Sequence, residues 1–190
     1  MNSVKRRTPR GLSSVLGAFL TLGLCLASCA PQPVFARGAS LTLATFSENS
    51  VDVTVKLQRS ADGRVLLLAT FTPESGYHVY SKDMPRQGVG GQGRPTLLEL
   101  TANSRMQSVG ALTDSIEATV NTISPSGALL ISYPEGPVTL TIPVSLPAGN
   151  AWTDDEISLT YMACKDTSCK VPVIGKSILV KVPGSAMLDE

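Results

Sequence analysis

Short segments of strand character recur through most of the chain after residue 50. The run 51–57 (VDVTVKL) alternates apolar and polar residues with a period of two, and 65–71 (VLLLATF) is a continuous apolar run of strand length. Five further segments have a similar character: 96–100, 128–132, 138–144, 157–162 and 177–182. Turn signals rich in Gly, Pro, Asn and Asp separate these segments, and no stretch keeps a helical period. The pattern predicts an all-β protein built as an antiparallel β-sandwich.

The N-terminus has the composition of an export signal. Four basic residues and no acid occupy the first ten positions, and the apolar stretch 12–26 is too short and too rich in Gly and Ser for a membrane span. The run 26–29 (LASC) resembles a bacterial lipoprotein signal, in which cleavage precedes the cysteine and a lipid is attached to its sulfur. We therefore predict a signal peptide over 1–28, lipidation of Cys29 and a tether over 29–40, with ordinary cleavage near Ala36 as the alternative.

Export changes the charge of the chain and the chemistry open to it. Sixteen basic residues less the four of the signal leave twelve against fifteen acids, so the mature chain would carry a net charge of −3. Such a chain lacks the excess of Lys and Arg that nucleic-acid binding needs. No later apolar stretch reaches the roughly 18 residues of a membrane helix, so we expect a location in the cell envelope or periplasm, with membrane contact through the lipid anchor alone. One domain over 41–183 and a C-terminal tail over 184–190 complete the predicted organisation.

The exported domain would contain one pair of cysteines, Cys164 and Cys169, with four residues between them. Cysteines that face each other across a hairpin can form a disulfide, and disulfides persist outside the cytoplasm. As a staple, the bond would close a very small loop and contribute only about 2 kcal/mol. As a redox centre, it would lie in a short loop open to attack, where Lys165 and Lys170 favour a thiolate and Asp166 opposes it. The spacing alone leaves both interpretations open.

Other candidate chemistry is sparse. His78 is the only histidine, so two cysteines and one imidazole give at most three metal ligands, at a spacing unlike that of a zinc finger. We predict no metal and no cofactor. His78 fits either a buried, hydrogen-bonded histidine or a group that tunes a thiolate, and Tyr80 fits a packing aromatic or a neighbour of the cysteines. The Gly-rich run 89–94 lacks the Lys-Ser/Thr ending of a phosphate loop and is interpreted as a plain loop.

Four pieces of the sequence together resemble one known family. The run 161–172 reads Tyr-Met-Ala-Cys, four residues, then Cys-Lys-Val-Pro, and is similar to the cysteine signature of the N-terminal periplasmic domain of the thiol:disulfide interchange protein DsbD. The run 76–81 (GYHVYS) looks like that family's Gly-Trp-His-Ile/Val-Tyr/Asn-Ser, and 94–100 (RPTLLEL) looks like its Pro-Thr-x-Leu-Glu-Leu. The run 138–144 (VTLTIPV) looks like the strand that precedes the cysteine hairpin. The order and spacing hold over about 40–183.

The resemblance implies an immunoglobulin-like sandwich in which Cys164 and Cys169 are the redox pair. It places His78, Tyr80 and Tyr161 as candidate neighbours of that pair. In the family the cysteines accept electrons from a thioredoxin-like domain and pass them to periplasmic disulfide isomerases or related thiol proteins. We therefore expect a protein-disulfide reductase-like electron carrier, with a thioredoxin-like or membrane electron-transfer protein as donor and a periplasmic disulfide protein as acceptor.

Two departures from the family pattern change the expectation. Well-known members continue into a membrane electron conduit and a thioredoxin-like domain, whereas this chain stops at Glu190, so it would take electrons from a separate protein. The family's cap loop carries an aromatic residue over the disulfide, whereas the matching region 118–127 has none and Ile123 is its bulkiest candidate.

Two other functions stay open. The first is a non-enzymatic, protein-binding sandwich of the envelope with a structural disulfide. The second is the supply of thiols for metal or haem maturation, as in cytochrome c biogenesis, which draws only on the envelope context.

Overall fold

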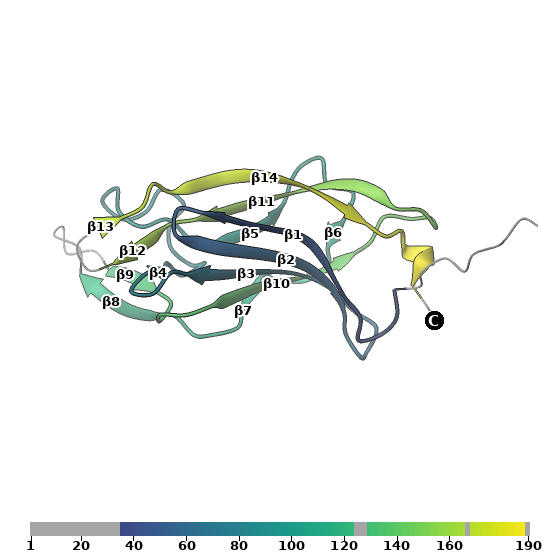
Figure 1. The fold of residues 1–190 in the computed structure, drawn as a ribbon, viewed down its shortest axis with the longest axis horizontal. Coiled ribbons are helices and arrows are strands. Elements are labelled where there is room, and N and C mark those ends of the chain that lie inside the picture. The colour runs from purple at the N-terminus through teal and green to yellow at the C-terminus, as the bar shows by residue number, and fades with distance from the viewer. Residues whose placement is uncertain (1–34, 124–128, 166–167, 189–190) are drawn as a thin grey trace, which may run out of the picture. The chain divides into compact units, whose positions relative to one another are not determined.

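Two antiparallel sheets form the body of the computed structural model, which describes residues 35–123, 129–165 and 168–188 (Figure 1). The first sheet has the order β1 (Ser40–Glu48), β2 (Val51–Arg59), β3 (Val65–Pro73), β10 (Val138–Ser145), and the short strands β6 (Gln107–Ser108) and β7 (Thr113–Asp114) both pair with β10. The second sheet has the order β14 (Val173–Val182), β11 (Thr153–Tyr161), β5 (Leu97–Leu100). All the ladders between these strands are antiparallel.

Alternate residues of both sheets fill the core between them. On β2, Val51, Val53, Val55 and Leu57 are fully buried, while Asp52 and the other residues between them are exposed or half-buried. The second sheet contributes buried apolar side chains of β5 and β11 to the same cluster. Burial of apolar surface at about 25 cal/mol per Å² is the main force that holds two such sheets together. The prediction of an all-β, immunoglobulin-like antiparallel sandwich is therefore confirmed.

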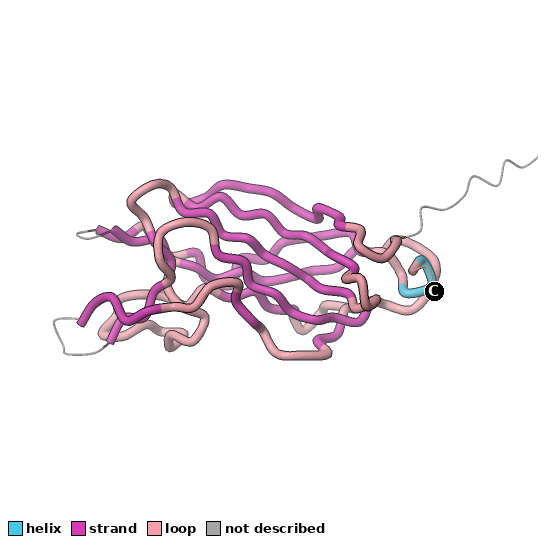
Figure 2. The backbone as a smooth tube through the Cα atoms, turned by 90° about the horizontal axis from the view of Figure 1, so that it is seen from below, coloured by secondary structure: helices cyan, strands magenta, loops and turns pink. Residues whose placement is uncertain are grey.

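Two small sheets occupy one end of the sandwich, at the left of Figure 1. One has the order β13 (Ser168–Cys169), β12 (Ala163–Lys165), β4 (His78–Val79), and the other pairs β8 (Thr119–Ile123) with β9 (Leu129–Ser132). The first described residue and the 3₁₀ helix η1 (Ser185–Met187) lie at the opposite end (Figures 1 and 2). Within the described ranges, no helix has the length and apolar character needed to cross a membrane.

The seven segments with strand character correspond to observed strands, and one long strand went unpredicted. β1 escapes the pattern because a bulge between Thr42 and Ala44 shifts its register against β2. The turn that follows uses Asn49 and Ser50, both at positive φ (52° and 62°), in place of the glycine that usually marks such a hairpin.

Residues at both described ends pack onto the sandwich. The Phe35 amide donates to the carbonyl of Met187 at 3.0 Å, and the Gly38 amide donates to the carbonyl of Arg59 at 2.7 Å. Residues 35–39 of the predicted tether therefore contact the domain, and the predicted tail holds η1 with Met187 buried. The predicted signal peptide and Cys29 lie outside the described residues, so the predicted domain bounds remain predictions.

Candidate functional site

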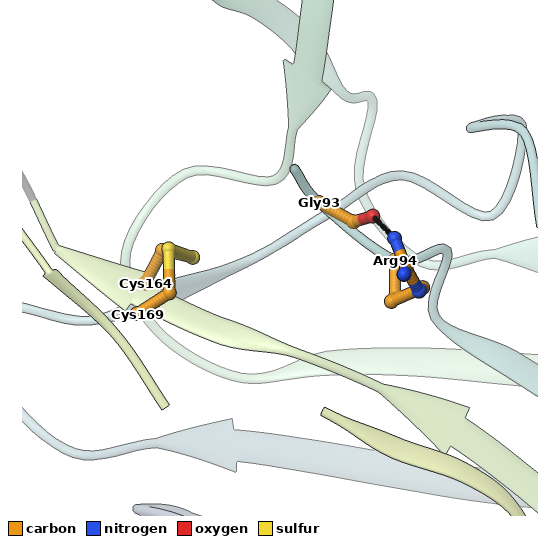
Figure 3. Close-up of a disulfide and its surroundings, with 4 residues drawn as sticks. All are labelled: Gly93, Arg94, Cys164 and Cys169. Carbon is orange, nitrogen blue, oxygen red and sulfur yellow. Dashed lines mark hydrogen bonds between the residues drawn. A yellow bond between two sulfur atoms is a disulfide. The ribbon is translucent and has the colours of Figure 1, made fainter. Parts of the chain in front are cut away.

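A hairpin made of β12 and β13 brings the two cysteines together. The antiparallel register places Cys164 directly opposite Cys169, and their Cα atoms are 4.0 Å apart. The two sulfurs are joined in a disulfide (Figure 3). Directly opposed strand positions bring β-carbons close enough for such a bond, so the local pairing explains the covalent link.

The other edge of β12 pairs with β4, so β12 is the central strand of a three-stranded sheet. Cys164 lies opposite His78, and Ala163 lies opposite Val79. The half-buried His78 ring makes an edge-to-face contact with Tyr80, with ring centroids 5.5 Å apart. The predicted neighbours His78 and Tyr80 are therefore held beside the disulfide by strand pairing and by aromatic packing.

The two sulfur-bearing residues differ in exposure. Cys164 is only 2% exposed and belongs to a small apolar cluster with Tyr80, Met84 and Leu130, whereas Cys169 is exposed. We call these four residues the Cys164 cluster. An attacking thiolate reaches the exposed Cys169 more readily than the buried Cys164.

A groove of about 710 Å³ runs along this face of the hairpin. His78, Tyr80, Cys164 and Cys169 all line it. Gly91 and Gln92 of the Gly-rich loop form part of its wall, and Glu135 contributes a carboxylate. The groove thus gathers four of the predicted site residues.

The Gly-rich loop is a defined wall of this groove. The amides of Val89 and Gln92 each donate to the other's carbonyl, at 2.8 and 3.0 Å. A Cβ on Gly93 would lie 3.1 Å from Met84 Cε, so this glycine lets the loop approach the Cys164 cluster. The neighbouring Arg94 guanidinium donates to the Gly93 carbonyl at 2.9 Å (Figure 3). Sequence reasoning missed this wall, although the density of glycines was a signal of close backbone approach.

Two lysines flank the hairpin on the ring of Tyr77. The amines of Lys165 and Lys170 lie 5.2 and 5.3 Å from the ring centroid. A cation over an aromatic face gains about 0.5–1 kcal/mol at an exposed site, so both positive charges are held close to the cysteine hairpin.

Tyrosines near the hairpin lie in two different environments. Burial raises the pKa of Tyr80, which lines the groove. Tyr161 is fully buried in the main core, with its ring centroid 5.5 Å from that of Phe71, and is absent from the groove lining. Burial, and next the charge of Glu48, raise the pKa of Tyr161.

Across residues 35–123, 129–165 and 168–188, no three His, Cys, Asp or Glu side chains gather to hold a metal ion. The described groove lining includes a disulfide with one exposed cysteine, an imidazole, two phenols and the Glu135 carboxylate.

Comparisons with known proteins give a distant likeness. No protein-family model matches the sequence, and no curated protein matches it. Among solved structures the chain is similar to the crystal structure of the Neisseria meningitidis DsbD n-terminal domain in the reduced form. That likeness has 16% sequence identity and a TM-score of 0.40, and it covers 71% of this chain and 86% of the other. It is a distant structural relationship, so the functional argument rests on the cysteine hairpin itself.

Proposed function

We propose that this chain is an exported thiol–disulfide exchange domain whose redox pair is Cys164 and Cys169. The observation that carries the proposal is the unequal exposure of the two bonded residues, with Cys169 open to solvent and Cys164 buried. The bond closes a loop too small to stabilise the domain by more than about 2 kcal/mol, so stability alone is a weak reason for it. The resemblance of 161–172 to a redox signature supports the same function.

The exchange begins with a donor thiolate that attacks the Cys169 sulfur. The Cys164–Cys169 bond breaks, its electron pair leaves on the Cys164 sulfur, and that sulfur takes up a proton. A mixed disulfide now joins the donor to Cys169. The donor's second thiolate attacks the donor sulfur of this bond and frees Cys169 as a thiolate. The donor ends as a disulfide, and the domain ends as a dithiol.

The reduced domain passes its two electrons on by the same steps in reverse order. The Cys169 thiolate attacks an acceptor disulfide, and one acceptor sulfur leaves as a thiolate. Cys164 then gives up its proton, attacks the Cys169 sulfur and releases the acceptor as a dithiol. We propose a thioredoxin-like or membrane electron-transfer protein as donor and an envelope disulfide protein as acceptor. The lipid at Cys29 would hold the domain at a membrane of the envelope.

The second candidate is a protein-binding sandwich in which the disulfide is structural. The observation that favours it is the position of Cys164, which is buried in the central strand of a small sheet with pairing on both sides. Such a bond would fasten β13 to the rest of the sandwich.

The reduction potential of the pair distinguishes the two functions. The oxidised chain is equilibrated with glutathione buffers of graded potential, and the thiols are then alkylated and counted by mass. We expect a potential above about −300 mV, in the range of exchange proteins. A potential below that value assigns the disulfide to a structural role and overturns the proposal.

Single-cysteine variants test the order of attack. Cys164→Ser leaves the exposed Cys169, which should form a stable mixed disulfide, under mild oxidation, with a thioredoxin-like protein whose second cysteine is replaced by serine. Cys169→Ser leaves the buried Cys164 and serves as the matched control, with little trapping expected. Equal trapping by both variants contradicts the assigned roles of the two sulfurs.

A further inference from the structure

An apolar groove of about 700 Å³ opens between the edge strands of the two sheets, far along β14 from the cysteine hairpin. Leu41 and Leu43 of β1 line one side, and Trp152, Leu179 and Val180 line the other. Leu179 is 81% exposed, and Trp152 is 44% exposed. We call this surface the Trp152 face.

Strand register explains why Leu179 points outward. β11 and β14 pair Asp155 with Val180, and both are buried toward the core. Because side chains alternate along a strand, the adjacent Leu179 projects from the opposite side of the sheet. The pair next to them, Lys181 and Asp154, forms an ion pair at 3.4 Å on the rim of the groove. The Trp152 face is thus apolar, with balanced charges at its edge.

The start of the described chain lies at this same end of the sandwich. Phe35 is hydrogen-bonded to Met187, and within the same terminal segment the Gly184 amide donates to the carbonyl of Ala151 at 3.0 Å, next to Trp152. Five residues lie between Cys29 and Phe35, and the six residue steps from one to the other span about 20 Å in a fully extended chain. A lipid on Cys29 would therefore keep this end of the domain within about 20 Å of the membrane surface.

We propose that the Trp152 face rests on the lipid bilayer that holds the anchor at Cys29. The occupant is the headgroup region of that bilayer, because a tryptophan ring favours the boundary between apolar and aqueous surroundings. The cysteine hairpin, at the other end of β11 and β14, would then point away from the membrane toward its partners. This contact rests on lipidation of Cys29 but is independent of the redox role of the disulfide.

Trp152 is the single tryptophan of the sequence, so its fluorescence reports this one surface. The chain is produced with its own signal, purified with its lipid and reconstituted into vesicles of phosphatidylethanolamine and phosphatidylglycerol. Brominated acyl chains quench a tryptophan that lies at the membrane boundary. We expect brominated vesicles to quench a large part of the Trp152 emission. Added salt should change this quenching little, because the positive and negative charges at the rim of the groove balance.

Variants on one strand give a matched comparison. Leu179→Asp adds a charge to the Trp152 face, at a side chain so exposed that the fold does not depend on it, and should largely abolish the quenching. Ile174→Asp, at a 63% exposed position of β14 near the hairpin, should leave the quenching unchanged.

Three results overturn the proposal. The first is equal Trp152 emission in plain and brominated vesicles, and the second is an unmodified Cys29 in the mass spectrum. The third is a Trp152 that is shielded from water only while the protein is concentrated within the vesicles. Loss of this shielding on dilution would assign the face to a second copy of the chain. The redox potential of the disulfide is not expected to change in any of these variants.

Discussion

Cys164 lies directly opposite Cys169 across one edge of β12 and directly opposite His78 across the other. The same three-residue strand therefore holds the buried sulfur between its disulfide partner and an imidazole. This pairing fixes Cys164 in place, while Cys169 stands on the two-residue outer strand β13. An outer strand this short opens at little cost, so we expect the two thiols of the reduced protein to differ in reactivity.

The reduced single-cysteine variants should therefore be alkylated at different rates. Cys169, left by Cys164→Ser, should react with iodoacetamide about tenfold or more faster than Cys164, left by Cys169→Ser, because local opening must precede attack on the buried thiol. Adding Leu130→Ala to Cys169→Ser removes one of the side chains packed around Cys164. The double variant should therefore be alkylated faster than Cys169→Ser, at a rate closer to that of Cys164→Ser. Equal rates in the two single-cysteine variants, measured by mass spectrometry, would show that the Cys164 cluster gives no protection in solution.

Local pattern was enough to predict the strands whose pairing is regular. β2, β3 and β10 pair residue by residue, so their alternation of buried and exposed positions follows the apolar pattern directly. β1 was missed because its bulge breaks that alternation, and the two-residue strands β4, β6 and β7 are too short to show any. Short strands of this kind are defined by their partners, which lie far away in the sequence.

The candidate site, too, could be predicted from the sequence only in part. The pairing of Cys164 with Cys169 is a local property of one hairpin and could be anticipated from spacing. The burial of Cys164 could not, because Tyr80, Met84 and Leu130 reach it from segments distant in sequence. Tyr161 was expected beside the redox pair on the basis of the motif, but its side chain faces Phe71 in the core.

A buried carboxylate should be among the main polar supports of the fold. Asp155 is 4% exposed and accepts hydrogen bonds from the backbone amides of Arg105, Met106 and Glu156, at 3.1, 3.0 and 2.7 Å. Asp155→Ala leaves these donors without their acceptor and should lower the free energy of unfolding by about 2–3 kcal/mol in urea denaturation. Asp154→Ala, one residue away but 80% exposed, is the control and should cost less than about 0.5 kcal/mol. Similar losses in both variants would contradict the supporting role of Asp155.

Gly91 of the Gly-rich wall should tolerate substitution, whereas Gly88, just before this loop, should not. Gly88 has φ +74°, and a Cβ there would lie 2.1 Å from the carbonyl oxygen of Gly93, so Gly88→Ala must displace the loop. Gly91 has φ +80° with nothing within 4 Å of its Cβ position, so Gly91→Ala should cost only the backbone strain of about 1–2 kcal/mol. We expect a larger loss of stability for Gly88→Ala, together with a changed rate of reduction by dithiothreitol. If both variants reduce at the wild-type rate, the loop does not shape access to the disulfide.

Alkaline pH should destabilise the protein through its buried tyrosines. Burial is the main cause that raises the pKa values of Tyr80, Tyr133 and Tyr161 above their ordinary value of 10.0. The folded chain then keeps phenolic protons that the unfolded chain releases. This contribution to stability is fully present below pH 10.0, the pKa of a tyrosine in the unfolded chain, and is lost as the pH rises above that value. The loss is at most about 1.4 kcal/mol per pH unit for each tyrosine.

Two measurements on the same samples check the alkaline loss. Urea denaturation should give a free energy of unfolding that falls above pH 10.0, and tyrosinate absorbance of the buried rings should rise together with the loss of circular dichroism. Tyr161→Phe removes one of these protons and gives up a long hydrogen bond, from the Tyr161 hydroxyl to the Glu48 carbonyl at 3.3 Å. The variant should therefore fold, and its free energy of unfolding should fall less steeply at alkaline pH. Ionisation of all four tyrosines near pH 10.0 in a chain that keeps its folded circular dichroism would show that burial does not hold the phenols neutral.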